Sequence, residues 1–333
     1  MRDMNEWLKT AAAQKLPFPI LSFPGVQITG TAVSELVRSG AKQAECMKAV
    51  AARWRTLASV SLMDLSVEAD AFGSPVRFFD DEVPAVTAAI VTDQKRLDEL
   101  KVPEVGASRT GEYVTTIKEA KKLITDRPVF GGAIGPFSLA GRLMDMSEIM
   151  VNCYEEPELV HGVLEKATQF LISYNTALRD AGADGIIMAE PAAGLLSPNL
   201  NAEFSTPYAK RIIQAVETEN CVFVYHNCGN NTIQLVKSIL ETGARAFSFG
   251  NAIDLSEMIP YFSENLIVMG NIDPAVQLRG GTPESVREAT LDVLDKCAKH
   301  PNFILSSGCD IPPMSPIENI DAFFSAAKEF YGE

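Results

Sequence analysis

The chain has 333 residues, of which 47% are hydrophobic, and carries a net charge of −14. This length suits a single α/β barrel with a large core, and the acidic balance argues against nucleic acid as a partner, because phosphate binding needs clustered Lys and Arg. No apolar run is long enough to span a membrane, and residues 1–15 lack the pattern of a signal peptide, so we expect a cytoplasmic protein.

The predicted elements alternate between short apolar runs and longer amphipathic segments. Residues 1–50 are predicted to be a helical addition that covers part of the main fold. The apolar runs that follow have the length of buried strands and are rich in Val, Ile and Phe. They are residues 59–65, 129–134, 185–189, 222–225, 246–249, 266–269 and 303–305.

Amphipathic segments between these runs are predicted to be helices. They cover residues 157–180, 232–242, about 283–299, which Thr282 caps, and 316–331. Strands that alternate with helices predict right-handed βαβ units in one parallel sheet. We therefore expect a (β/α)8 TIM-like barrel in which residues 1–333 form a single domain. Seven strands are evident, and the eighth is either distorted or lies within the first hundred residues.

Polar and metal-binding residue types follow the predicted strands. In an α/β barrel the active site lies at the carboxyl ends of the strands, so these residues are expected to meet at the barrel mouth. They are Asp64 and Glu68 after the first strand, Glu190 after the third, His226 and Cys228 after the fourth, Asn271 and Asp273 after the sixth, and Cys309 after the seventh.

His226, Cys228 and Cys309 form a candidate zinc site. Residues two apart in an extended chain point to the same side, so His226 and Cys228 can face one ion, and the barrel brings Cys309 to them from another strand end. One imidazole and two thiolates leave the fourth tetrahedral position open, as in a catalytic zinc site. The alternative is a packed histidine and small buried cysteines. The remaining cysteines, Cys46, Cys153, Cys221 and Cys297, are predicted to be structural.

The strand-end carboxylates have several possible roles. Asp64 and Glu190 are placed to bind substrate, to act as acid or base, or to complete the zinc shell. A structural role, capping the next helix or pairing with an arginine, is equally open. Asp310 is similarly placed to hydrogen-bond a turn.

Several blocks of the chain, from about residue 57 to the end, resemble the uroporphyrinogen decarboxylase superfamily. They are residues 62–69, 128–139, 182–198, the Gly-Asn-Ile-Asp-Pro-Ala sequence at 270–275, and 316–319. The resemblance implies a barrel that accepts tetrapyrrole-like substrates. Asp64 matches the essential aspartate of the decarboxylases.

The superfamily comprises metal-free decarboxylases and corrinoid-linked methyltransferases. Decarboxylases carry arginines in an N-terminal block that corresponds to residues 23–30, where this chain has none, and a Gly-His where it has Gly308-Cys309. The methylcobamide:coenzyme M methyltransferases carry a His-x-Cys pair and a distant cysteine as zinc ligands, which match His226, Cys228 and Cys309. Residues 67–73 also resemble this branch.

The resemblance implies a zinc-dependent transfer of a methyl group between a methyl-corrinoid, on a separate corrinoid protein, and a zinc-bound thiol such as coenzyme M. Asp64 and Glu190 are the predicted catalytic carboxylates, with Glu190 a candidate fourth zinc ligand in the absence of substrate. Glu68, Asn271 and Asp273 are predicted to bind substrate. The identity of the thiol, the direction of transfer and the oligomeric state are open. The alternatives are a metal-free tetrapyrrole decarboxylase and a non-catalytic corrinoid- or tetrapyrrole-binding protein.

Overall fold

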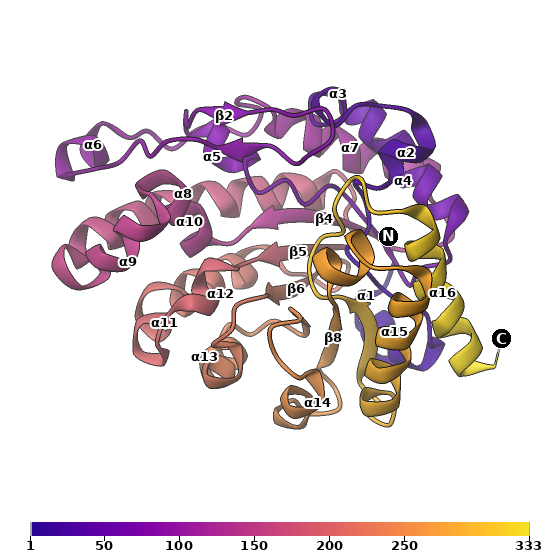
Figure 1. Cartoon of the computed structure of the whole chain (residues 1–333). Helices are drawn as coiled ribbons and strands as arrows, with labels where there is room; N and C mark the ends of the chain where they lie inside the picture. Colours follow the sequence, from indigo (N-terminus) through magenta and orange to yellow (C-terminus); the bar gives the residue numbers. More distant parts are fainter. Residues whose placement is uncertain (1, 333) are drawn as a thin grey trace.

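The computed structural model describes residues 2–332 and shows a curled sheet of seven parallel strands, surrounded by helices (Figure 1). The strand order is β1-β4-β5-β6-β7-β8-β9, so consecutive strands of the sheet are neighbours. These strands are β1 (Ser59–Val60), β4 (Val129–Ile134), β5 (Gly185–Ala189), β6 (Val222–Asn227), β7 (Ala246–Phe249), β8 (Ile267–Ile272) and β9 (Phe303–Ser307). A separate antiparallel pair is formed by β2 (Val76–Arg77) and β3 (Ala85–Val86).

All seven apolar runs contain strands, and β4, β5 and β7 have the predicted bounds. Strand β1 is shorter than predicted. Its hydrogen bonding to β4 continues for one residue, because Ser61 N donates to Phe130 O and Gly132 N donates to Ser61 Oγ. A side-chain oxygen thus takes the place of a backbone carbonyl, and the regular ladder ends there.

An extended segment, residues 17–20, lies between the two edges of the sheet. Phe18 N donates to Leu305 O of β9, and Leu57 N, just before β1, donates to Pro17 O. Pro17 and Pro19 have no N–H group, so the segment cannot form a regular ladder with both neighbours. The α/β TIM-like fold is therefore confirmed, with this irregular segment in place of an eighth strand among the described residues.

Residues 4–14 and 25–53 are largely helical, as predicted for an N-terminal addition. The helices before β5 are α1 (Met4–Thr10), η1 (Ala12–Gln14), α2 (Gly25–Thr29), α3 (Val33–Leu36), α4 (Gly40–Arg53), α5 (Val67–Ala71), α6 (Gln94–Glu99), α7 (Thr110–Leu123), α8 (Pro136–Met144), α9 (Met146–Glu155) and α10 (Pro157–Asp180). Those after β5 are η2 (Ala192–Leu195), α11 (Pro198–Phe204), α12 (Thr206–Val216), η3 (Thr232–Leu235), α13 (Val236–Glu241), α14 (Leu255–Met258), η4 (Ile259–Tyr261), η5 (Pro274–Arg279), α15 (Pro283–Cys297) and α16 (Ile317–Tyr331).

Two apolar cores hold the molecule together. The larger one lies between the sheet and the outer helices, and the smaller one fills the inside of the barrel with side chains such as Val222, Val224 and Ile304. Helix α1 closes the end of this inner core opposite the strand carboxyl ends: the rings of Trp7, Phe18 and Phe130 pack with centroids 5.2–6.5 Å apart. Polar side chains are therefore left to the mouth at the other end.

No helix within residues 2–332 is long and apolar enough to cross a membrane.

Candidate metal centre

Strand β6 directs His226 into the barrel. Val222 and Val224 belong to the inner core, and side chains two apart on a strand face the same side, so His226 continues this inward row at the end of the strand. Cys228 follows directly after β6. Gly250 makes room for it, because a Cβ atom at Gly250 would lie 2.5 Å from the Cys228 Cβ.

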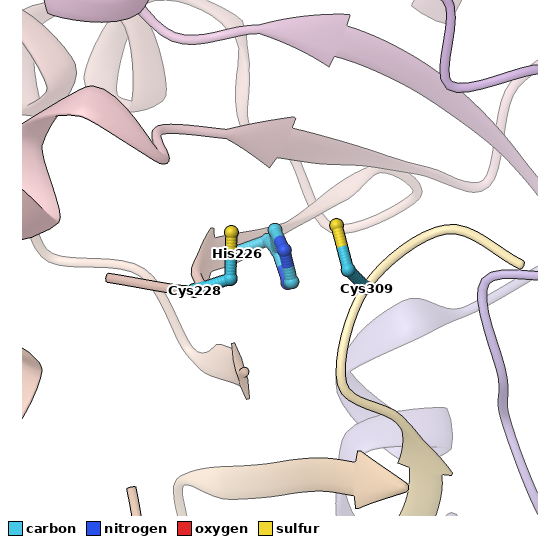
Figure 2. Close-up of side chains that lie close together, drawn as sticks. All are labelled: His226, Cys228 and Cys309. Atoms are coloured by element: carbon cyan, nitrogen blue, oxygen red, sulfur yellow. The ribbon is translucent and has the colours of Figure 1, made fainter. Parts of the chain in front are cut away.

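His226, Cys228 and Cys309 come together at the mouth, with Cys309 on the loop after β9 (Figure 2). A ring nitrogen of His226 and the two Sγ atoms lie within 4.8 Å of one another. It is the only such group of His, Cys, Asp and Glu among residues 2–332, and no fourth side chain of these types joins it. Tetrahedral zinc sites have metal–ligand distances of about 2.0–2.3 Å, so ligand atoms at this separation fit around one ion.

The His226 ring leaves one nitrogen free. Its Nδ1 lies 3.0 Å from Ser248 Oγ on the neighbouring strand β7, and the two residues are paired in the β6–β7 register. Its Nε2 is buried without a hydrogen-bond partner among the described residues. When Nδ1–H donates to the serine, Nε2 carries the lone pair that a metal requires, which is the usual arrangement of a metal-ligating histidine.

The two thiols are coupled to each other. A hydrogen bond between them lowers the pKa of Cys228 and, together with burial, raises the pKa of Cys309 to about 12. Metal binding requires both sulfurs as thiolates and so releases their protons. Burial also raises the pKa of Cys46, Cys221 and Cys297 to about 12 and of Cys153 to about 11, so only Cys228 has a lowered pKa. None of these four other cysteines joins the group.

The structure places Asp64 in a saturated ion-pair cluster. Its Oδ2 accepts hydrogen bonds from the Arg109 guanidinium and from Tyr113 OH, and its Oδ1 accepts from the backbone and hydroxyl of Ser66. Arg109 also pairs with Asp70. Every acceptor position of Asp64 is thus occupied by the protein.

Glu68 is buried with one free oxygen. Its Oε1 accepts a hydrogen bond from Ile134 N at the end of β4, and its Oε2 has no partner among the described residues. Burial raises the pKa of this carboxyl to about 7. Glu68 therefore has one carboxyl oxygen free to form a hydrogen bond with a ligand.

Glu190, fully buried, caps helix α8. Its carboxylate accepts from Phe137 N at 3.0 Å and Ser138 N at 2.7 Å, and Gly135 allows this approach because a Cβ there would lie 2.5 Å from the Glu190 Cδ. Burial raises its pKa to about 7, against the opposing effect of these donors. Glu190 therefore caps a helix that precedes it in the chain rather than the next helix, which was the structural role left open by the sequence, and it is outside the candidate metal group.

Asn271 and Asp273 lie on another side of the mouth. The Asn271 amide donates to Gly250 O and Ile253 O, and Asp273 caps η5 and accepts from Asn251. Both line a pocket of about 260 Å³ that extends to α15 and contains none of the three metal-group residues. Their hydrogen bonds chiefly fix loop conformation, and their substrate-binding role stays a prediction.

Sequence reasoning missed four residues around the mouth: Ser248, Arg109, Tyr113 and Arg142. Ser248 had a signal, since it is the one polar residue in the apolar run 246–249. Arg109 and Tyr113 lie at or near the start of α7, far along the chain from a strand end, and Arg142 lies on α8, the helix after β4. Nothing in their local pattern separates them from surface residues.

Fold and site together define an α/β barrel with a candidate metal centre of one histidine and two cysteines at its mouth. Residues 21–330 match the Uroporphyrinogen decarboxylase (URO-D) family, and the chain belongs to that family.

The relatives include both methyltransferases and decarboxylases. The chain is 30% identical to the methylcobamide:CoM methyltransferase MtbA of Methanosarcina acetivorans, over 94% of each chain. It is 26% identical to the uroporphyrinogen decarboxylase of Coxiella burnetii, over 82% of this chain and 77% of the relative. A solved methyltransferase from Methanosarcina mazei has the same fold, with a TM-score of 0.85, 23% identity, and coverage of 99% of this chain and 100% of that one. The chain is accordingly an enzyme of the methyltransferase type within the family.

Proposed function

We propose that the protein is a zinc-dependent methyltransferase that moves a methyl group between a methyl-corrinoid and a small thiol such as coenzyme M. The observation that carries the proposal is the convergence of His226, Cys228 and Cys309 within 4.8 Å at the barrel mouth. The similarity to a methylcobamide:CoM methyltransferase supports the same reaction.

The three side chains fit zinc in both chemistry and environment. Thiolate and imidazole ligands favour zinc over the harder cations that oxygen ligands select, and the buried, unpartnered Nε2 of His226 needs a partner. When bound, zinc would hold the acceptor sulfur as a nucleophilic thiolate near neutral pH. Because only three side chains converge within residues 2–332, a position remains for the acceptor.

The remaining mouth residues orient rather than ligate in this proposal. Ser248 fixes the His226 ring. Asp64 acts through Arg109, which it anchors, and Glu190 acts through the N-terminus of α8, which it caps. Glu68, with its free Oε2, contacts the substrate, while Asn271 and Asp273 shape the neighbouring loop.

The methyl transfer balances in two-electron terms. The thiolate sulfur forms a bond to the methyl carbon, the Co–C bond breaks, and cobalt keeps its electron pair and passes from Co(III) to Co(I). The corrinoid performs the leaving-group chemistry, and the protein supplies orientation. We propose that the corrinoid arrives on a separate corrinoid protein. The six cysteines are free, which supports a reducing compartment, and we place this single-domain enzyme in the cytoplasm.

The test combines metal analysis with turnover. Protein purified without added metal should contain about one zinc per chain, with a zinc-edge X-ray absorption spectrum that shows two sulfur ligands and gains a third with coenzyme M. Methylcobalamin and the thiol should then yield methyl thioether and Co(I). A protein that takes up no zinc and decarboxylates uroporphyrinogen would instead be a decarboxylase. Zinc with a closed shell and no methyl transfer would indicate a binding protein.

A further inference from the structure

A small pocket at the barrel mouth contains none of the three metal-group residues but includes Asp310, which directly follows Cys309. It has a volume of about 230 Å³ and is lined by residues that include Met63, Leu65, Arg142 and Asp310. Asp310 directly follows Cys309 in the chain, so one wall of the pocket is continuous with the metal-ligand loop. Arg142, on helix α8, also lines the pocket.

Arg142 is a cation without a partner. Its Nε is buried, and no residue of the described chain forms a hydrogen bond or an ion pair with it. Burial lowers the pKa of Arg142, whereas the charges of Asp64 and Glu68 oppose this effect. A guanidinium stays protonated at any physiological pH, so its desolvated charge persists.

The acids around Arg142 do not neutralise it. Asp310 and the exposed Glu82 line the same pocket, but neither forms an ion pair with Arg142, and the Asp310 Oδ1 is buried without a partner among the described residues. Asp64 is already occupied by Arg109, Tyr113 and Ser66. Glu68 bonds to the β4 backbone, and its remaining oxygen has no partner, Arg142 included. A partly buried charge that lacks a partner is costly, and an anionic ligand in the pocket would relieve that cost.

We propose that Arg142 binds the acidic group of the acceptor thiol and so selects a thiol that carries a sulfonate or a carboxylate. This inference rests on the proposed function, since it places the thiol end at the metal centre and the acidic end in the Arg142 pocket. The planar fork of a guanidinium matches the oxygen atoms of either acid. Arg142 is thus a specificity-determining residue outside the metal-ligand set.

The experiment compares thiols that share a two-carbon spacing but differ in charge. Isothermal titration calorimetry on zinc-loaded protein measures the Kd of 2-mercaptoethanesulfonate, 3-mercaptopropionate, 2-mercaptoethanol and cysteamine. The wild-type protein should bind at least one acidic thiol about 10- to 100-fold more tightly than the neutral and cationic thiols, the range expected for hydrogen bonds to a charged partner. The first two thiols reveal whether sulfonate or carboxylate is preferred.

Variants then assign the preference to one side chain. Arg142→Gln should remove the preference for acidic thiols and leave the Kd of 2-mercaptoethanol unchanged, and Arg142→Lys should retain part of it. Arg287→Gln, which changes an exposed arginine on α15, is the matched control and should behave as wild type.

Two results would overturn the proposal: a wild-type protein that binds 2-mercaptoethanol or cysteamine as tightly as the acidic thiols, or an Arg142→Gln variant that folds, binds zinc and keeps the preference. The wild-type comparison decides even when Arg142→Gln does not fold. The calorimetry contains no methyl donor, so it tests thiol binding separately from methyl transfer. If acidic thiols bind through Arg142 but no thiol accepts a methyl group in the methylcobalamin assay, the role of Arg142 is supported and the proposed function is contradicted.

Discussion

The carboxyl ends of β5 and β6 lie side by side but use their polar side chains differently. Glu190 N donates to His226 O, so the two residues are direct neighbours at the mouth. The carboxylate of Glu190 accepts hydrogen bonds from two backbone amides, whereas the Nε2 of His226 has no partner among residues 2–332. A strand-end position therefore does not by itself distinguish the two residues; the difference is that His226 has a ring nitrogen without a hydrogen-bond partner.

Removal of a proposed metal ligand is the strongest test of this comparison. In Cys309→Ser a hydroxyl replaces the thiol, and zinc binding should weaken by more than the 10- to 100-fold that loss of an outer partner costs, with methyl transfer abolished. Metal content after dialysis and the methylcobalamin assay measure both. Cys153→Ala, a buried cysteine on α9 outside the group, should keep its zinc. A Cys309→Ser enzyme with full methyl transfer would exclude the zinc-thiolate mechanism.

Glu190 should behave in the opposite way. Glu190→Ala leaves Phe137 N and Ser138 N buried without acceptors, and each costs about 1–3 kcal/mol. We expect the free energy of unfolding to fall by about 2–5 kcal/mol, as measured by thermal or urea denaturation. The variant should still bind one zinc per chain.

The matched control is Glu165→Ala on α10, whose exposed ion pair with Arg211 should contribute less than about 1 kcal/mol. If Glu190→Ala instead lost zinc while keeping its stability, Glu190 would belong to the metal site and the contrast with His226 would fail.

The contrast between these two strand ends also explains what the sequence could predict. The period of apolar residues identified β4, β5, β7 and α10 with their bounds, because buried parallel strands and amphipathic helices have distinct patterns. It also placed His226, Cys228 and Cys309 at strand ends that meet. It could not predict the segment at residues 17–20, since two prolines hide its extended role.

The use of each polar group was beyond sequence reasoning for a physical reason. Glu190 and His226 follow buried strands in the same way, and only the three-dimensional contacts show that α8 occupies the carboxylate. The environment of Arg142 could not be predicted from the sequence either. An arginine on an amphipathic helix normally reaches solvent, and only the fold shows that Arg142 lies near Asp64 and Asp310, which are distant in the chain, without an ion pair to either.

Glu68 tests whether a carboxyl group with a free oxygen at the mouth changes how the free energy of unfolding depends on pH. Its pKa is raised from 4.5 to about 7 by burial. The folded state therefore holds a proton that the unfolded state releases, so this carboxyl contributes stability at low pH that is lost as pH rises from about 4.5 to about 7. At about 1.4 kcal/mol per pKa unit, the loss is at most about 3.5 kcal/mol.

Glu68→Gln keeps the acceptor for Ile134 N but cannot ionise. Its stability should fall less than that of the wild type over this pH range, as measured by unfolding at pH 5, 6, 7 and 8. The exposed Glu45→Gln on α4 should leave the wild-type slope unchanged. Identical slopes for Glu68→Gln and wild type would show that Glu68 is ionised throughout and has a partner.

The smallest expected effect concerns the orientation of His226 rather than its presence. Ser248→Ala removes the partner of Nδ1 while leaving Nε2 and both thiols in place, so zinc affinity should fall about 10-fold. Competition with a chromophoric chelator measures the change, and Ser248→Thr should restore most of the affinity because it keeps the hydroxyl. Ser173→Ala, on the exposed face of α10, is the control. An unchanged affinity in Ser248→Ala would mean that packing alone orients the ring. The contrast between Glu190 and His226 would then depend only on the proposed metal ligands and not on the hydrogen bond to Ser248.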